Sequence, residues 1–168
     1  EGLVIESLNN VNVTGENYHD VYKLFDDVGF NSTSTQRYLG ETGNDVNNPS
    51  ASTPTLLGWF DTSGQKISQL DYIEMTTWDY LDGNRLPQTF NVEGYDAQSG
   101  EWKFIQRFVD VELPANIDTT EHVLRVDLER GGLYSGFRIA VEDTRDNFNA
   151  IQLSELDFYT TDVQNLFS

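Results

Sequence analysis

One stretch near the C-terminal end of the sequence, FRIAVEDTRDNFNAIQLSELDFYT, limits the possible fold more than any other. In its first run Phe137, Ile139 and Val141 alternate with other residues, a period of two that is typical of a strand with one buried face. The polar residues 142–149 follow, and a second alternating apolar run occupies residues 151–158. The stretch therefore predicts a strand, a polar loop and a second strand.

The second run contains a break in its alternation. Ile151 and Leu153 share one parity, whereas Leu156 and Phe158 share the other. Such a phase change inside a strand predicts a β-bulge, here at Ser154–Glu155. Because a bulge releases backbone groups from the ladder and redirects side chains, a bulge beside a carboxylate suits a cation site.

Other short strands are predicted along the chain, at residues 3–8, 56–60, 67–78, 89–95, 101–108 and 123–129. A turn at residues 61–64 separates the second strand from the third, and a hairpin is expected across residues 96–100. Residues 26–54 are polar and are expected to form a long loop. With no long helical periodicity, the pattern predicts an all-β protein, an antiparallel jelly-roll β-sandwich forming one domain over residues 1–168.

Three segments resemble the galactose-binding-like β-sandwich family, which includes the coagulation-factor type C (discoidin) domains and many carbohydrate-binding modules of bacterial glycoside hydrolases. IQLSELDFYT resembles the closing strand of that family, and VYKLFDDVGFNSTST its early metal loop. NRLPQTFNVEGYDAQSGEWKFI resembles its middle strand pair, in which an Arg-x-Pro entry precedes a hairpin with Trp. The resemblance implies the fold, and leaves the ligand open because one fold hosts many functions.

The resemblance also implies a calcium site, since hard oxygen ligands are what calcium prefers. The positions that match the family's ligands are the carbonyls of Lys23, Val28 and Ser154 and the side chains of Asp26 and Glu155, with Asn31 or Thr33 completing the shell. The usual Asp-Gly of the family is Asp26-Asp27 here, so Asp27 could replace or join Asp26. The alternative is that Asp26 caps a turn and Glu155 pairs with an arginine.

Family members that bind sugars do so with loops at one end of the sandwich. Such a site needs an aromatic platform for the pyranose ring and planar polar groups for its hydroxyls. Three segments supply both kinds of residue: Gln36, Arg37 and Tyr38; Trp78, Asp79, Tyr80, Asp82, Asn84 and Arg85; and Arg145, Asp146, Asn147, Phe148 and Asn149. The alternatives are core packing for Trp78 and Phe148 and a structural ion pair for Arg85.

The charge of the chain excludes some partners. With 28 acidic and 10 basic residues the net charge is -18, which repels nucleic acid. The acidic residues are scattered, which favours solubility as the explanation of the charge. An affinity for divalent cations is the more specific alternative. The absence of cysteine excludes a disulfide framework. No apolar run is long enough to span a bilayer, so no membrane insertion is expected.

No catalytic signature is apparent, since Gly132–Gly136 has the wrong spacing for a nucleophile elbow and no His-Glu-x-x-His is present. We therefore expect a non-catalytic, calcium-stabilised carbohydrate-binding module of a larger extracellular protein, secreted or at the cell surface. Its expected partners are a glycan or polysaccharide and neighbouring domains of the same chain. Two alternatives remain: an adhesion or protein-interaction domain of a cell-surface or viral fibre protein, and membrane-surface binding through Trp78–Leu81, which the charge disfavours.

Overall fold

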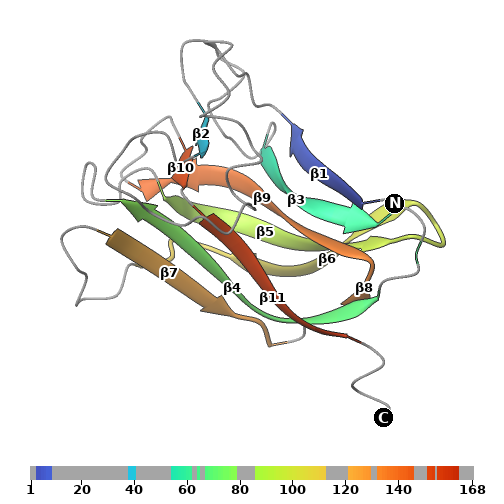
Figure 1. Ribbon diagram of the computed structural model, residues 1–168. Coiled ribbons are helices and arrows are strands. Elements are labelled where there is room, and N and C mark those ends of the chain that lie inside the picture. Colours follow the sequence, from blue (N-terminus) through green and yellow to red (C-terminus); the bar gives the residue numbers. More distant parts are fainter. Residues whose placement is uncertain are drawn as a thin grey trace.

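The computed structural model describes residues 3–8, 38–40, 54–61, 64, 67–78, 86–112, 121–129, 132–145, 151–153 and 155–162. Every element in these ranges is a β-strand, and every described strand pair is antiparallel (Figure 1). The described residues contain no helix with the length and apolar character needed to cross a membrane. The all-β prediction is confirmed.

Five strands form the larger sheet. Their spatial order is β1 (Leu3–Leu8), β3 (Thr55–Asp61), β9 (Gly136–Thr144), β5 (Pro87–Asp96) and β6 (Glu101–Phe108). The predicted hairpin is present, because β5 and β6 pair across a four-residue turn in which Gly100 N donates to Asp96 O at 2.8 Å. Gly100 has a positive φ of 71°, a conformation that glycine adopts without a steric cost.

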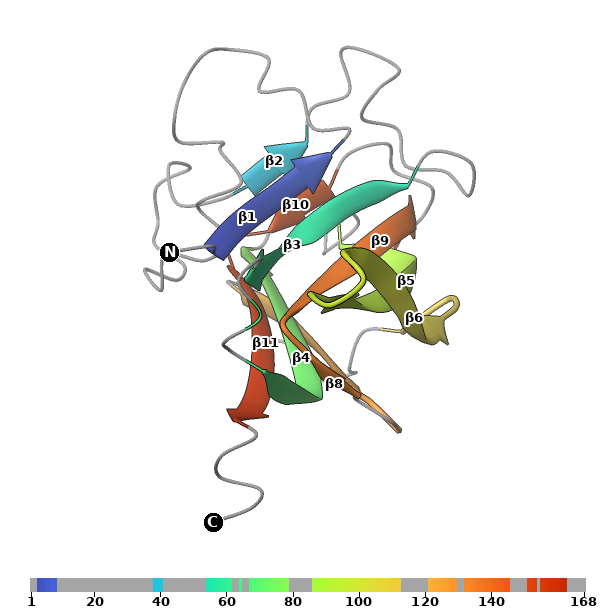
Figure 2. The same ribbon diagram turned by 90° about the vertical axis from the view of Figure 1, so that its right-hand side faces the viewer.

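A second sheet of four strands covers one face of the first. Its members are β11 (Glu155–Asp162), β4 (Ser68–Trp78) and β7 (Glu121–Asp127), in that order, together with β8 (Leu133–Tyr134), which pairs with the beginning of β4. Two short strands, β10 (Ile151–Leu153) and β2 (Tyr38–Gly40), form a separate small sheet. Figure 2 shows the two larger sheets as layers of a sandwich.

The core lies between these two sheets and contains the alternating apolar residues of the strands. Its buried members include Leu57, Phe90, Val92, Phe137, Ile139 and Val141 from the larger sheet and Leu70, Ile73, Met75, Leu124, Val126 and Leu156 from the smaller one. The Phe137 ring stands edge-on to Trp59 at 5.9 Å and stacks with Phe158 of β11 at 6.3 Å. Phe137 therefore joins the two layers.

The prediction for residues 61–64 is right about the turn. Gly64 N donates to Asp61 O at 3.3 Å. The strands on either side of this turn do not pair, however, because β3 lies in the five-stranded sheet and β4 in the four-stranded sheet. A turn signal shows where the chain changes direction, and here the turn carries the chain from one layer to the other.

The expected bulge at Ser154–Glu155 is replaced by an exchange of partner strands. Leu153 of β10 pairs with Tyr38, whereas Glu155 of β11 pairs with Thr76 of β4. The change of partner accounts for the change of parity. The described irregularity between β11 and β4 lies farther along, between Tyr159 and Thr160.

Two boundaries of the expected loops are also wrong. Residues 142–144 belong to β9, which is longer than the alternating apolar run alone suggests. Tyr38, expected in a loop, lies in β2, so the polar segment 26–54 contains a strand. Residues 142–144 are polar and β2 is only three residues long, so pairing with a neighbouring strand decides their conformation.

Candidate functional site

The described strand ends bring the predicted ligand segments to one end of the sandwich, which we call the loop end. Here β4 ends at Trp78, β5 begins at Pro87 and β9 ends at Thr144, on the left of Figure 1. Pro87 pairs with Thr144, and Arg145 N donates to Leu86 O at 3.1 Å. The chain on either side of residues 79–85 is thus joined to the chain that leads into residues 146–150.

The third predicted segment is attached close by. Tyr38 of β2 pairs with Leu153 of β10, which follows residues 146–150 directly. Trp78 is the last residue of β4, and its backbone pairs with Glu121 of β7. The remaining predicted ligand residues lie outside the described part of the chain: Gln36, Arg37, Asp79, Tyr80, Asp82, Asn84, Arg85, Asp146, Asn147, Phe148 and Asn149.

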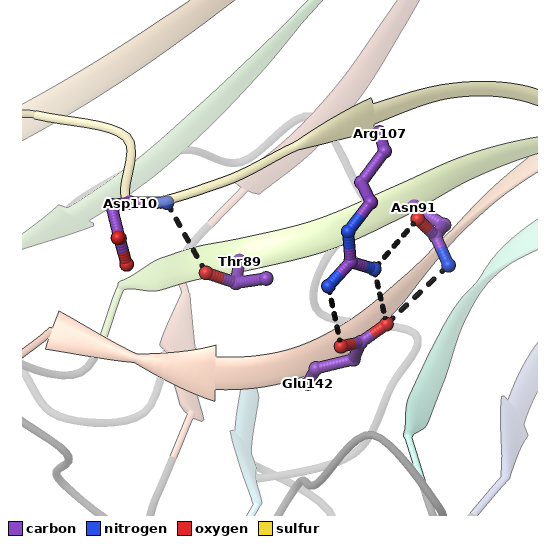
Figure 3. A network of polar contacts seen from close by, with 5 residues as sticks. All are labelled: Thr89, Asn91, Arg107, Asp110 and Glu142. Atoms are coloured by element: carbon purple, nitrogen blue, oxygen red, sulfur yellow. Dashed lines mark hydrogen bonds and ion pairs between the residues drawn. The ribbon is translucent and has the colours of Figure 1, made fainter.

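The predicted ligand segments leave the sandwich beside a polar network that sequence reasoning missed (Figure 3). The Arg107 guanidinium of β6 donates to both carboxylate oxygens of Glu142 of β9, at 2.6 and 2.9 Å. Asn91 of β5 accepts from Arg107 at 3.1 Å and donates to Glu142 at 3.4 Å. Three strands of the larger sheet are therefore joined on its outer face.

The electrostatics of this network follow from its geometry. Hydrogen bonds from Arg107 lower the pKa of Glu142 below its ordinary value. The same bonds raise the pKa of Arg107. The Glu142 side chain is 12% exposed and that of Arg107 is 43% exposed, so solvent screens the pair from one side only.

Backbone contacts fix the chain that follows β6 against the same region. Asp110 has a positive φ of 51°, and its N–H donates to Thr89 Oγ1 at 3.2 Å. The Arg145 guanidinium donates to Val111 O at 2.6 Å. Arg145, the first residue of the third predicted ligand segment, thus anchors one edge of the loop end.

The described part of the predicted metal site is Glu155. This residue opens β11 and pairs with Thr76. Leu156 is fully buried in the core, so strand alternation places Glu155 on the opposite face of the sheet, yet it is only 6% exposed. A buried carboxylate requires compensation by hydrogen bonds, a cation or a metal ion.

The other predicted ligands lie outside the described residues: Lys23, Asp26, Val28, Asn31, Thr33 and Ser154. The described ranges themselves hold no group of three or more His, Asp or Glu side chains that could bind a metal ion. The pairing of Tyr38 with Leu153 places β2, the described strand that follows the early segment in sequence, beside the strand that leads to Glu155. The donor that is described, a hard and buried carboxylate, fits the chemistry of calcium.

Known proteins share this fold. No protein-family model matches the chain, and no curated protein matches its sequence. Among solved structures, the C-terminal domain of a chitobiase from Bacteroides fragilis has a TM-score of 0.60 at 15% identity, covering 96% of this chain and 95% of its own.

Two carbohydrate-binding modules of Clostridium perfringens are similar to the same extent. The family 32 module of NanJ, in complex with galactose, has a TM-score of 0.57 at 11% identity and covers 94% of this chain and 93% of its own. Another module, in complex with GalNAc-β-1,3-galactose, has a TM-score of 0.61 at 7% identity, covering 94% and 95%. At these identities the likeness shows the fold, which is the β-sandwich that the sequence predicted.

Proposed function

We propose that this protein is a non-catalytic carbohydrate-binding module whose ligand site is the loop end. The observation that carries the proposal is the joining of the strand ends: Trp78, Pro87, Thr144 and Tyr38 all lie where the predicted ligand segments leave the sandwich. Segments rich in aromatic, amide and guanidinium groups are thereby attached to one rigid frame.

The chemistry of these segments suits a sugar. An aromatic ring such as Trp78 or Phe148 can cover the apolar face of a pyranose, and Asn84, Arg85 or Asn147 can hydrogen-bond its hydroxyls. The similar modules solved with galactose and with GalNAc-β-1,3-galactose make glycans that contain these sugars the first candidates.

We assign calcium a structural role in this proposal. Glu155 and the early segment are far apart in sequence, and an ion bound by both would hold them together. A ligand that binds only the folded state stabilises it by mass action. The ion would therefore support the loop end without contacting the sugar.

The module would attach a larger secreted or surface protein to glycans. One such site binds a sugar weakly, and linkage to neighbouring domains raises the effective concentration of each site. The net charge of -18 also opposes binding to nucleic acid and anionic lipid.

A glycan array with calcium present tests the proposal, using the intact chain and the variants Trp78→Ala and Phe148→Ala. We expect binding to one sugar class, lost in at least one variant while the melting temperature stays unchanged. Phe104→Ala is the matched control, because Phe104 is a 62% exposed aromatic side chain in β6, outside the predicted ligand segments.

A blank array with a well-folded protein would contradict a sugar ligand. It would favour the alternative of an adhesion domain with a protein partner. Binding that survives both substitutions would move the sugar site away from Trp78 and Phe148.

A further inference from the structure

The opposite end of the sandwich, which we call the turn end, contains a pocket of about 440 Å³. Its lining residues come from the β3–β4 turn, the β5–β6 turn and β8 with the residues beside it. The β5–β6 turn and β8 are on the right of Figure 1. Its volume is within the range of small-molecule sites, about 300 to 1,000 Å³. The residues that line it are Gly64, Ile67, Tyr95, Asp96, Ala97, Gln98, Leu133, Tyr134 and Ser135.

Close packing holds one wall of this pocket in place. The Tyr134 ring lies directly on Gly94, where an added Cβ would be 2.1 Å from a ring carbon, and it stands edge-on to Phe137 at 6.3 Å. No side chain other than hydrogen fits at Gly94 unless Tyr134 moves.

Packing also holds Tyr95 in place. Its ring lies 4.7 Å from Phe60 and 5.3 Å from Trp102, on the outer face of the larger sheet, because strand alternation turns residues 94 and 95 to opposite faces. Backbone bonds connect these residues, since Ser135 N donates to Tyr95 O at 2.9 Å and Asp61 N donates to Ser135 O at 2.7 Å. A pocket with fixed walls loses little conformational entropy when a ligand binds.

The lining combines apolar and polar residues. Tyr95, Tyr134, Ile67 and Leu133 supply apolar surface, with Ile67 and Leu133 41% and 49% exposed, and Asp96, Gln98 and Ser135 are polar. A pyranose also combines an apolar C–H face with an edge of hydroxyls.

Two polar side chains of the lining, Asp96 and Gln98, can form hydrogen bonds beyond those within the turn. Each carboxylate oxygen of Asp96 accepts one bond within the turn, from Gln98 N at 3.0 Å and from Ser99 Oγ at 3.1 Å. A carboxylate can accept about four hydrogen bonds, so Asp96 can accept more from a ligand. The amide of exposed Gln98 adds both a donor and an acceptor.

The charge of the pocket narrows the ligand class. Among the described residues that line it, Asp96 is the one charged side chain. The ammonium of Lys103, on the neighbouring strand β6, is bound to Glu101 at 2.8 Å. With a net charge of -18 on the whole chain, an anionic sugar is repelled.

We infer that the turn end holds a second carbohydrate site, which takes one neutral pyranose and rejects uronic and sialic acids. The 11 residues of β4 separate it from the loop end by about 33 Å, so one sugar residue cannot occupy both sites. The inference depends on the pocket's own lining, and it stands whether or not the loop end binds a sugar.

The test is an NMR titration of the 15N-labelled protein with galactose, N-acetylgalactosamine, glucose and glucuronic acid at millimolar concentrations. We expect saturable shifts of the Ala97, Gln98 and Ser135 amides with at least one neutral sugar and none with glucuronic acid. In the double variant Gln98→Ala/Leu133→Ala these shifts should saturate about tenfold more weakly, because one hydrogen-bonding group and one apolar contact are removed.

Both substituted side chains are exposed, so the variant is expected to fold, and an unchanged amide spectrum away from the pocket checks this. Phe104→Ala is the control, since it removes a large exposed apolar side chain outside the pocket and should leave the titration unchanged. Flat titrations at the turn end, or equal saturation in the double variant, would overturn the inference. Shifts confined to Trp78 and Leu153 would overturn it while supporting the proposed function.

Discussion

The two ends of the sandwich are built differently. At the turn end the β5–β6 connection is four residues long and the β3–β4 connection six, and Gly64, Gly100 and Gly132 have positive φ values. At the loop end β4 and β5 are joined through the eight residues 79–86, and β6 and β7 through the twelve residues 109–120. The same two sheets therefore carry tight turns at one end and longer polar connections at the other.

The fold thus separates a surface made by close packing from a surface carried on longer connections. A tight turn fixes its own side chains, so the pocket at the turn end is made by packing, with Tyr134 lying on Gly94. A longer connection is free to carry side chains chosen for a ligand, because the strands at its base already hold its position. The Arg107–Glu142 pair supports such a base.

The largest expected effect comes from removing Phe137, the core residue that joins the two layers beside the turn end. Phe137→Ala should reduce the free energy of unfolding by about 3 to 5 kcal/mol, since it leaves a cavity between Trp59, Tyr134 and Phe158. Urea unfolding followed by tryptophan fluorescence measures the loss. A loss below about 1 kcal/mol would show that the layers do not depend on this ring.

The second effect concerns the loop end alone. Calcium at 100 times its dissociation constant should stabilise the folded protein by about 2.7 kcal/mol. The stabilisation should disappear in Glu155→Gln, which keeps the shape of the side chain and removes its charge. Thermal unfolding with calcium and with EDTA measures it.

The matched control for that experiment is Glu112→Gln, which removes the same charge from an exposed residue. It should keep the full response to calcium. Equal responses in Glu155→Gln and in the unchanged protein would remove Glu155 from the ligand set.

The smallest effect is expected for the Arg107–Glu142 pair. A double-mutant cycle with Arg107→Ala and Glu142→Ala should give a small stabilising coupling energy, because Arg107 is partly exposed and solvent screens the pair. Coupling indistinguishable from zero would mean that the pair does not stabilise the base of the loop end.

The same pair predicts a pH dependence with a definite sign. The pKa of Glu142 is lowered from 4.5 in the folded state, so its contribution is complete above the unfolded value and is lost as the pH falls below it. Stability curves of the unchanged protein and of Glu142→Gln should therefore converge below pH 4.5. Curves that stay parallel through this range would contradict the assignment.

The alternation of apolar residues predicted most of the strands, because burial between two layers imposes a period of two. It could not predict which strands pair. Residues 61–64 have the composition of a hairpin turn, but the strands on either side of them do not pair. β3 pairs with β1 and β9 in the larger sheet, whereas β4 lies in the smaller sheet. Pairing depends on long-range packing, which a local pattern does not encode.

The polar network was missed for a related reason. Counting outward from the β5–β6 turn in simple register places Asn91 opposite Gln106 and turns Arg107 inward. An irregularity at Val92/Glu93 shifts the register by one residue and places Arg107 opposite Asn91. The opposite charges of Arg107 and Glu142 were visible in the sequence, but their proximity depends on that shift.

A crystal structure of the calcium-loaded protein with its best array glycan tests most directly whether the loop end binds a sugar. We predict a pyranose beside the connections that follow β4 and β9, with an aromatic ring against its apolar face. A structure in which the sugar lies only at the turn end, or in which the loop end stays empty at saturating sugar, would contradict it.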